Sequence, residues 1–244
     1  MLLTIDIGNT NISLGLFRKS SLVRRYQIPT KNKKYFPFLK KIICKNEIGD
    51  AIICSVVPSA SKILERDLNR LLEKRILIIG KDIIVPIRNL YRKPKQVGSD
   101  RLVNAYAGFK LYGSPLIVVD FGTAITFDVV SKNKEYLGGM ILPGLEISLD
   151  ALATKTALLP KVKLEKPKEL IGRDTRNSML SGIVYGFAAF TDCLVKRLKS
   201  KLGINTKVIG TGGNISLISK YCKQIDKIDI DLALKGLSLI YNNR

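Results

Sequence analysis

The chain has 244 residues, enough for one large domain or for two of about 120 residues, each with its own core. Its 41 lysines and arginines exceed its 20 aspartates and glutamates and give a net charge of +21, but they lie in short groups without interleaved aromatic residues. We therefore expect solvated basic faces and no specific nucleic-acid partner. Histidine is absent, which excludes a histidine-based catalytic triad.

The first half of the chain predicts three antiparallel strands followed by alternating helices and strands. Alternating apolar residues and helical periodicity give the following order: strands at 2–8, 11–17 and 22–28, a helix at 35–45, a strand at 51–56, a helix at 58–74 and a strand at 76–79. Residues 81–94 contain two prolines and little periodicity, so we expect a strand or loop there.

The second half repeats this order. The expected elements are strands at 116–121, 125–130 and 136–141, helices at 146–154 and 177–201, a strand at 207–210, and helical segments at 215–221 and 232–241. Short apolar strands alternating with helices indicate the α/β class, with one sandwich in each half. The predicted domains are residues 1–113 and 114–244.

Two aspartates mark corresponding places in the two halves. Asp6 lies in TIDIGNTN and Asp120 in VVDFGTAIT, each after an apolar, β-branched run and before Gly and Thr. Gly8 and Gly122 let the backbone approach a ligand, and the threonines that follow offer hydroxyl and N–H groups to phosphate. One such match would favour an ordinary turn. Two matches in corresponding places predict a clamp for a polyphosphate.

A third glycine motif, GTGGN at 210–214, follows another apolar strand and would place the backbone against an adenine or ribose, although a plain strand-to-helix turn is an equal alternative. Together the three motifs resemble the phosphate-1, phosphate-2 and adenosine motifs of the actin-like ATPase superfamily. This resemblance implies two tandem ribonuclease H-like domains, each with a βββαβα core.

The segment YRKPKQVGSDRLVNA at 91–105 narrows the resemblance. With DFGTAITFDVV, GGMILPGLEISLDALATKTALLP (138–160) and GRDTRNSMLSGIVYG (172–186), the chain resembles type III pantothenate kinase from residue 1 to about residue 240. The resemblance implies ATP-dependent phosphorylation of pantothenate to 4′-phosphopantothenate, the first step towards coenzyme A. It also implies a homodimer that needs a divalent metal such as Mg²⁺ and a monovalent cation, K⁺ or NH₄⁺.

The GSDR residues suit the roles that the resemblance implies at the pantothenate site. Gly98 allows close approach, Ser99 fits an N-cap, and Asp100 falls in the first turn of a helix. The resemblance makes Asp100 the base for the substrate hydroxyl, whereas by itself it would only favour the helix dipole. Arg101 can make a forked pair with the pantothenate carboxylate or, less specifically, a surface ion pair.

Two further residues are assigned to pantothenate by the resemblance alone. Tyr91 stands where the family places a substrate-contacting tyrosine, and would otherwise be assigned to packing. Thr175 matches a hydroxyl-bearing substrate contact, reached from the dimer partner or nearby, and would otherwise cap the long helix.

The nucleotide and cation assignments rest on the two aspartate loops. The first phosphate loop is expected to comprise Asp6, Ile7, Gly8, Asn9, Thr10, Asn11, Ile12 and Ser13. Asp6 would face the metal–phosphate end of ATP and could hold a divalent ion through water, while Asp120 would hold the monovalent cation and Thr123 would touch phosphate. A competing assignment makes both aspartates ligands of Mg²⁺, and the sequence does not separate the two.

Two alternatives to this function stay open. One is another small-molecule kinase of the same fold, because nucleotide loops do not specify the acceptor. The other is a kinase-like transcription-accessory or regulatory protein, which the basic charge would suit.

The start, MLLTIDIGNT, lacks a basic region and a cleavage site, and no apolar run reaches the ~18 residues of a span, so we expect a cytoplasmic protein with no membrane partner. The four scattered cysteines are expected to be reduced and mostly buried.

Overall fold

The computed structural model describes residues 1–32 and 34–244. Contacts divide the chain into two compact units. Unit 1 comprises Met1–Lys110 together with Asp231–Arg244, and unit 2 comprises Leu111–Ile230. The first boundary lies close to the expected one, but the C-terminal segment differs from the expected second domain because it belongs to unit 1.

Unit 1 contains the predicted run of three strands followed by helices and single strands. Its elements are β1 (Leu2–Ile7), β2 (Asn11–Arg18), β3 (Ser21–Pro29), α1 (Phe36–Lys45), β4 (Asp50–Ser55), α2 (Pro58–Leu72), β5 (Leu77–Ile78), β6 (Arg88–Asn89), the 3₁₀ turn η1 (Pro94–Gln96), α3 (Ser99–Tyr112, which runs into unit 2) and α7 (Leu232–Asn242). The strands of its sheet lie in the order β3-β2-β1-β4-β5, in which β1 is antiparallel to β2 and parallel to β4.

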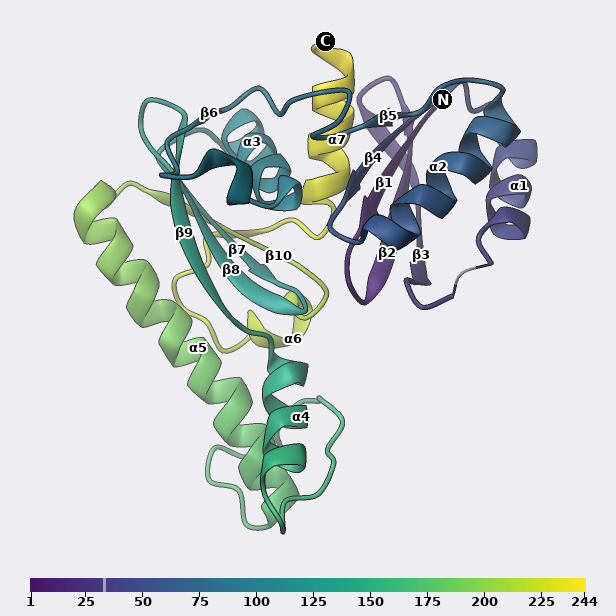
Figure 1. Cartoon of the computed structure of the whole chain (residues 1–244). Coiled ribbons are helices and arrows are strands. Elements are labelled where there is room, and N and C mark those ends of the chain that lie inside the picture. Colours follow the sequence, from purple (N-terminus) through teal and green to yellow (C-terminus); the bar gives the residue numbers. More distant parts are fainter. Residues whose placement is uncertain (33) are drawn as a thin grey trace. The chain divides into compact units, whose positions relative to one another are not determined.

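The two faces of this sheet carry two separate apolar clusters. Leu3, Ile5 and Ile7 of β1 are buried together with side chains of α1 and α2. The opposite face, represented by Leu2 and by Ile52 of β4, packs against α3 and α7. This division follows from the alternation of side chains along a strand. Figure 1 shows α1 and α2 on one side of the sheet and α7 (yellow) on the other.

Helix α7 explains why the chain returns to unit 1. Its Leu234, Leu237 and Ile240 are buried in the same cluster as Leu2 and Ile52, and the helix packs on β1, β2 and β4. Without this helix the second face of the sheet would expose its apolar side chains to water, which costs about 25 cal/mol per Å².

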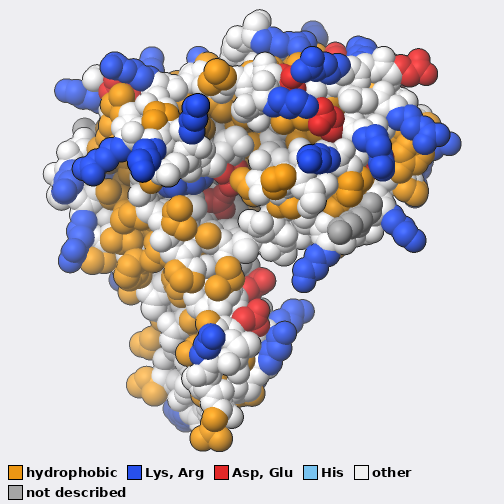
Figure 2. Space-filling view, viewed as in Figure 1, with side chains coloured by type: hydrophobic (Ala, Val, Ile, Leu, Met, Phe, Trp, Pro, Cys, Tyr) orange, Lys and Arg blue, Asp and Glu red, His pale blue; other side chains and the backbone are white. Residues whose placement is uncertain are grey.

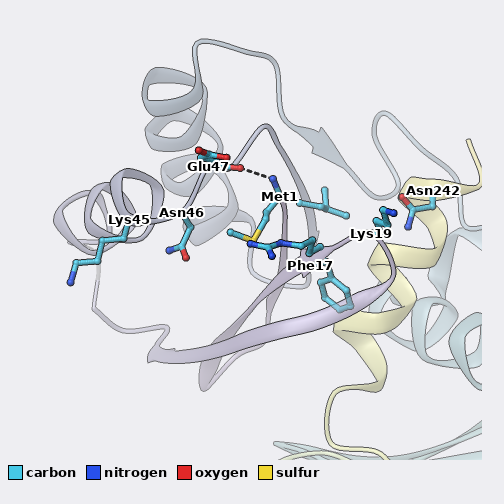
Figure 3. A pocket seen from close by; sticks show the side chains of 9 residues that line it. Met1, Phe17, Lys19, Lys45, Asn46, Glu47 and Asn242 are labelled. Atoms are coloured by element: carbon cyan, nitrogen blue, oxygen red, sulfur yellow. Dashed lines mark hydrogen bonds between the residues drawn. The ribbon is translucent and has the colours of Figure 1, made fainter.

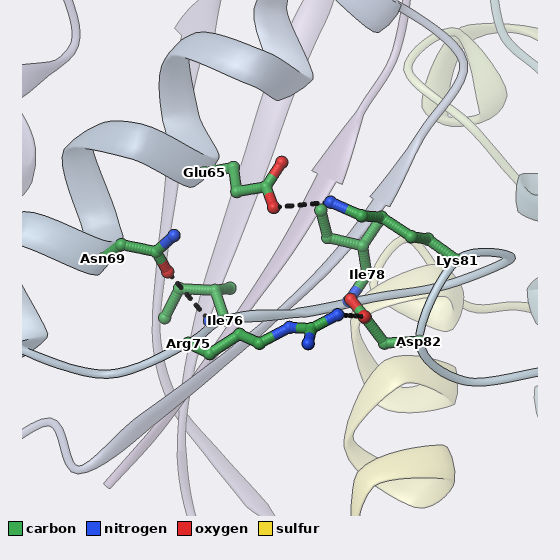
Figure 4. A network of polar contacts seen from close by, with 7 residues as sticks. All are labelled: Glu65, Asn69, Arg75, Ile76, Ile78, Lys81 and Asp82. Carbon is green, nitrogen blue, oxygen red and sulfur yellow. Dashed lines mark hydrogen bonds and ion pairs between the residues drawn. The ribbon is translucent and has the colours of Figure 1, made fainter.

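Polar contacts fix the connection from α2 through β5. The backbone N–H of Ile76 donates to Oδ1 of Asn69 (2.9 Å), and that of Ile78 donates to Oδ2 of Asp82 (3.0 Å). Arg75 pairs with Asp82 (Figure 4). The carboxylate of Asp82 therefore holds both the backbone and a side chain of this segment.

Unit 2 repeats the topology of unit 1. Its elements are β7 (Leu116–Phe121), β8 (Ala124–Val130), β9 (Glu135–Pro143), α4 (Leu145–Lys155), α5 (Thr175–Leu202), β10 (Lys207–Thr211), α6 (Ile215–Ile218) and β11 (Lys227–Ile228). These strands lie in the order β9-β8-β7-β10-β11, which matches β3-β2-β1-β4-β5. The repeat that the two aspartate motifs predicted is therefore present in the topology as well.

The expected elements agree with the observed ones to within a few residues, with two differences. The helix expected at 215–221 is the short α6, and the two-residue strand β11 was not expected. The stretch 81–94, expected as a strand or loop, contains the two-residue strand β6 and the start of η1. Short elements lack enough residues to establish a periodicity, so sequence patterns define them poorly.

Helix α5 is long and apolar enough to cross a membrane by length and composition alone, and it is the one such helix among residues 1–32 and 34–244. A core helix passes the same test. Val184, Ala188 and Val195 of α5 are buried in the core of unit 2, and 39% of the apolar window is buried. The apolar character of α5 is thus partly explained by packing.

Candidate functional site

The first aspartate loop lies at the tip of the β1–β2 hairpin. Asp6 is paired with Ser13 across the hairpin and with Cys54 on β4. The loop is closed by a hydrogen bond from the N–H of Gly8 to the carbonyl of Asn11 (3.0 Å). Thr30, which the sequence did not single out, donates its hydroxyl to the carbonyl of Gly8 (2.7 Å). The hairpin tip is thus braced by the residue that directly follows β3.

The residues of this loop differ in what they can offer a nucleotide. Asn9, Thr10 and Asn11 are exposed at the tip. Ile7 and Ile12 are fully buried in the core and are paired with each other across the hairpin, so they anchor the loop. A tight hairpin loop with exposed polar residues and buried apolar anchors is a suitable phosphate cradle.

Asp6 and Asp100 are two carboxyl groups of unit 1 whose pKa values are raised. Burial, and then the charge of Asp100, raise the pKa of Asp6 to about 7. Burial also raises the pKa of Asp100, while the backbone N–H and the guanidinium of Arg101 oppose that rise. The loop that was expected to hold ATP phosphates and the residue that was expected to act as base therefore lie within electrostatic reach of each other.

The GSDR segment forms the start of α3. Helix α3 begins at Ser99, so Ser99 is its first residue rather than the expected N-cap, and Asp100 is in the first turn as expected. Oδ1 of Asp100 accepts a hydrogen bond from the N–H of Arg101 (2.8 Å). A side chain on Gly98 would overlap Oδ1 of Asp100, so glycine is required for this placement of the carboxylate. Arg101 is buried, which argues against the surface ion pair.

Cys54 lies at the candidate site although no sequence motif predicted it there. This residue was assigned only to the buried thiols, but its Sγ lies 3.5 Å from Oγ of Ser99 and its strand position is next to Asp6. Burial raises the pKa of this thiol well above its usual value, and the charge of Asp6 adds to the effect. No local pattern could have revealed this placement, because it depends on the parallel pairing of β1 with β4.

Unit 2 repeats the hairpin arrangement around Asp120. Asp120 is paired with Thr126 across the β7–β8 hairpin and with Thr211 on β10. Gly212 has φ = +96°, and a Cβ atom there would overlap Oδ1 of Asp120 and the backbone of Phe121. The GTGGN motif is thus a turn between β10 and α6 that folds directly against the second aspartate.

The remaining predicted residues are placed as follows. Thr123 is exposed at the tip of the second hairpin, and its carbonyl accepts from the N–H of Gly144 (3.1 Å). Thr175 is the exposed first residue of α5, and Asp174, not Thr175, caps that helix by accepting from the N–H of Asn177 (2.7 Å). The capping role considered for Thr175 is therefore wrong. Tyr91 in unit 1 is half-buried.

A cavity in unit 1 lies apart from these residues. It has a volume of about 640 Å³ and is lined by residues that include Met1, Phe17, Lys19, Glu47 and Asn242 (Figure 3). None of the residues expected to bind nucleotide or substrate lines it. Its size alone therefore does not make it the active site.

The comparisons with known proteins decide the family. The type III pantothenate kinase family matches residues 2–197. The chain is 41% identical over 250 residues to the type III pantothenate kinase of Citrifermentans bemidjiense, covering 99% of this chain and 98% of the relative. It is 38% identical over 254 residues to that of Agathobacter rectalis, covering 100% and 98%. This chain belongs to the type III pantothenate kinase family.

Solved structures support the fold that this family membership implies. A structure from Campylobacter jejuni, assigned to the Baf family of transcriptional activators, has a TM-score of 0.62 at 20% identity and covers 99% of this chain and 98% of its own. One from Sinorhizobium meliloti, described as a 2-dehydro-3-deoxygalactonokinase protein, has a TM-score of 0.56 at 12% identity and covers 100% and 99%. These likenesses show the fold, and the expected α/β class is confirmed.

A kinase of this family uses ATP, and the site of unit 1 fits a divalent cation. Asp6 and Asp100 are two carboxylates within electrostatic reach of each other, and burial, followed by the charge of Asp100, raises the pKa of Asp6 to about 7. No group of three or more His, Cys, Asp and Glu side chains that could hold a metal occurs among the described residues. This donor set suits Mg²⁺, which takes one or two carboxylates and completes its shell with water and phosphate oxygens.

Proposed function

We propose that this protein transfers the γ-phosphoryl group of ATP to the hydroxyl of pantothenate, giving 4′-phosphopantothenate in the first step of coenzyme A biosynthesis. The observation that carries the proposal is the coupling of Asp6 to Asp100 in a chain that matches type III pantothenate kinases along its whole length. In this proposal the phosphate loop and the base serve one reaction.

Asp100 acts as the general base. The hydroxyl oxygen of pantothenate attacks the γ-phosphorus, the bond to the β-phosphate oxygen breaks to release ADP, and the hydroxyl proton goes to the Asp100 carboxylate. The raised pKa of Asp100 supports this role, because a more basic carboxylate is a better proton acceptor. Positioning and charge stabilisation supply most of the catalysis in phosphoryl transfer, so a strong base is not needed.

Pantothenate is oriented by its carboxylate in this proposal. Arg101, which is adjacent to Asp100 and buried, provides a planar fork that matches a carboxylate. Gly98 and Ser99 line the same turn, and Tyr91 and Thr175 contribute further contacts as the family resemblance implies.

ATP and cations complete the proposed site. The loop from Asp6 to Ser13 binds phosphate through its backbone, and Thr123 adds a phosphate contact. A divalent cation such as Mg²⁺ held by Asp6, directly or through water, would neutralise charge on the ATP phosphates. Asp120 would hold K⁺ or NH₄⁺, a role supported by its glycine-lined surroundings at Gly122 and Gly212.

We further infer that the protein is a cytoplasmic homodimer. Leu137 and Ile141 of β9 and Phe190 of α5 are exposed apolar residues of unit 2. Figure 2 shows hydrophobic side chains gathered over α5 and β9. Exposed apolar surface of this kind marks interaction sites, which supports a dimer contact there. Sedimentation of the purified protein at micromolar concentration tests this, and a monomer would exclude it.

A coupled ADP-release assay over a panel of acceptors tests the function. We expect turnover with pantothenate in the presence of ATP, Mg²⁺ and K⁺, and little or none with a hexose, glycerate or acetate. The matched control is Asp100→Asn, which should lose most of this turnover. Turnover of a sugar or acetate in preference to pantothenate would support another kinase of the same fold instead.

A further inference from the structure

Cys54 occupies a position between the phosphate loop and the substrate turn of unit 1. It lies on β4, is fully buried, and is the direct neighbour of Asp6 in the parallel pairing of β1 with β4. Its Sγ donates to Oγ of Ser99 at 3.5 Å, within the range of a sulfur hydrogen bond. Ser99 in turn precedes Asp100 at the start of α3. One small side chain thus connects the strand beside Asp6 to the turn that carries the proposed base.

The internal repeat shows that this position is built in the same way twice. In unit 2, Thr211 takes the place of Cys54, because β10 pairs with β7 so that Thr211 is the neighbour of Asp120. Thr211 is also buried. Both units therefore place a small, buried side chain with a proton to donate beside the strand aspartate.

We propose that Cys54 is a positioning residue, which orients the hydroxyl of Ser99, and with it the Gly98–Asp100 turn, for pantothenate. This inference rests on the proposed function. In the contact between the two side chains the thiol of Cys54 is the donor and Oγ of Ser99 is the acceptor. Because Oγ of Ser99 accepts this bond, the hydroxyl proton of Ser99 is directed away from Cys54 and is available to an oxygen of the substrate.

The proposal predicts a specific kinetic pattern. Loss of the thiol should impair pantothenate binding rather than the chemical step, since Ser99 is expected to contact substrate and Asp100 keeps its own bond to the N–H of Arg101. We expect Cys54→Ala to raise KM for pantothenate by about 3- to 10-fold, the range of one hydrogen bond of ordinary strength. The kcat and the KM for ATP should change less than about twofold.

A double-mutant cycle distinguishes this role from simple packing. In a Ser99→Ala background, Cys54→Ala should add almost no further rise in KM, because the bond is already lost. Cys54→Ser restores a donor and should return KM to within about twofold of the wild type. Cys44→Ala, at an exposed thiol on α1, is the matched control and should leave all parameters unchanged.

The outcomes of these kinetic measurements either support or overturn the positioning role of Cys54. If Cys54→Ala proves too unstable to assay, Cys54→Val fills the space without a donor and takes its place in the cycle. An unchanged KM, or an equal rise in KM with and without the Ser99 hydroxyl, would overturn the positioning role. A wild-type protein that does not turn over pantothenate would instead refute the proposed function, and the role of Cys54 would fall with it.

Discussion

Asp6 and Asp100 are coupled across two elements that are far apart in the sequence. Asp6 lies on β1 and Asp100 in the first turn of α3, yet the charge of Asp100 adds to burial in raising the pKa of Asp6 to about 7. In the metal-free protein Asp6 is therefore partly protonated at neutral pH. A bound cation would displace that proton, so nucleotide–metal binding and proton release are expected to be linked.

The raised pKa of Asp6 predicts that the metal-free protein is less stable at pH 8 than at pH 5.5. The pKa rises from 3.8 in the unfolded chain to about 7 in the folded one, so the folded state binds the proton more tightly between these values. The contribution of the protonated Asp6 carboxyl to the stability of the folded state is complete below pH 3.8 and is lost as pH rises through about 7. Melting temperatures in EDTA at the two pH values measure this.

Asp6→Asn is the control for the pH effect. It removes the titrating group, so the difference in melting temperature between pH 5.5 and 8 should shrink. The window is well suited to the test, because the chain contains no histidine that would titrate there. An undiminished difference in the variant would assign the effect to other groups.

Substitutions of Asp100 and Arg101 are expected to change different kinetic parameters. Asp100→Asn cannot accept the hydroxyl proton, so kcat should fall, by about 10²- to 10⁴-fold for a general base, with little change in KM. Arg101→Lys keeps the charge but loses the planar fork, so its main effect should be a higher KM for pantothenate. Steady-state kinetics with varied pantothenate separates the two. Wild-type kcat in Asp100→Asn would show that another group takes the proton.

Asp120 is expected to make turnover depend on the monovalent cation. The rate in sodium-only buffer should be low and should recover with K⁺ or NH₄⁺, because ion size selects the set of oxygen ligands. Asp120→Asn should lose this response while circular dichroism stays unchanged. Equal wild-type rates in all three buffers would remove the role and favour the competing assignment to Mg²⁺.

Gly212 and Gly213 are adjacent but should differ sharply in tolerance to alanine. At Gly212, φ is +96° and a Cβ atom would overlap Asp120, so Gly212→Ala should destabilise the protein by about 1–3 kcal/mol and weaken ATP binding. At Gly213 no atom lies within 4 Å of the added Cβ. Gly213→Ala should therefore melt close to the wild type in thermal denaturation. A large loss of stability for Gly213→Ala would show that the room for a Cβ atom does not explain the difference in tolerance between the two glycines.

A DNA-binding measurement tests the regulatory alternative, which the basic charge of the chain would suit. If this charge is a compositional feature, binding to duplex or single-stranded DNA at ~0.15 M salt should be weak and non-specific, with a Kd of roughly 10⁻⁴ to 10⁻⁶ M. Lys and Arg side chains are spread over the face shown in Figure 2, between apolar ones, which favours this outcome. Sequence-dependent binding a thousand-fold tighter in a fluorescence anisotropy titration would revive the regulatory function.

The sequence by itself determined the order of the main elements and the internal repeat, and it supplied most of the residues proposed for the site. Period-two and helical patterns are local, and so are the motifs around Asp6, Asp120 and the GSDR segment, so they can be recognised without knowledge of long-range contacts. For the same reason the family resemblance, and the function inferred from it, were available from the chain alone.

Only the tertiary structure decided which distant residues meet. The placement of Cys54 beside Asp6 and Ser99 depends on the parallel pairing of β1 with β4, and the contact of Gly212 with Asp120 depends on that of β10 with β7. Helix α7 packs on unit 1 because the second face of that sheet needs apolar cover, a demand that its own sequence does not reveal. Strand pairing and burial are properties of the whole chain, and local patterns do not encode them.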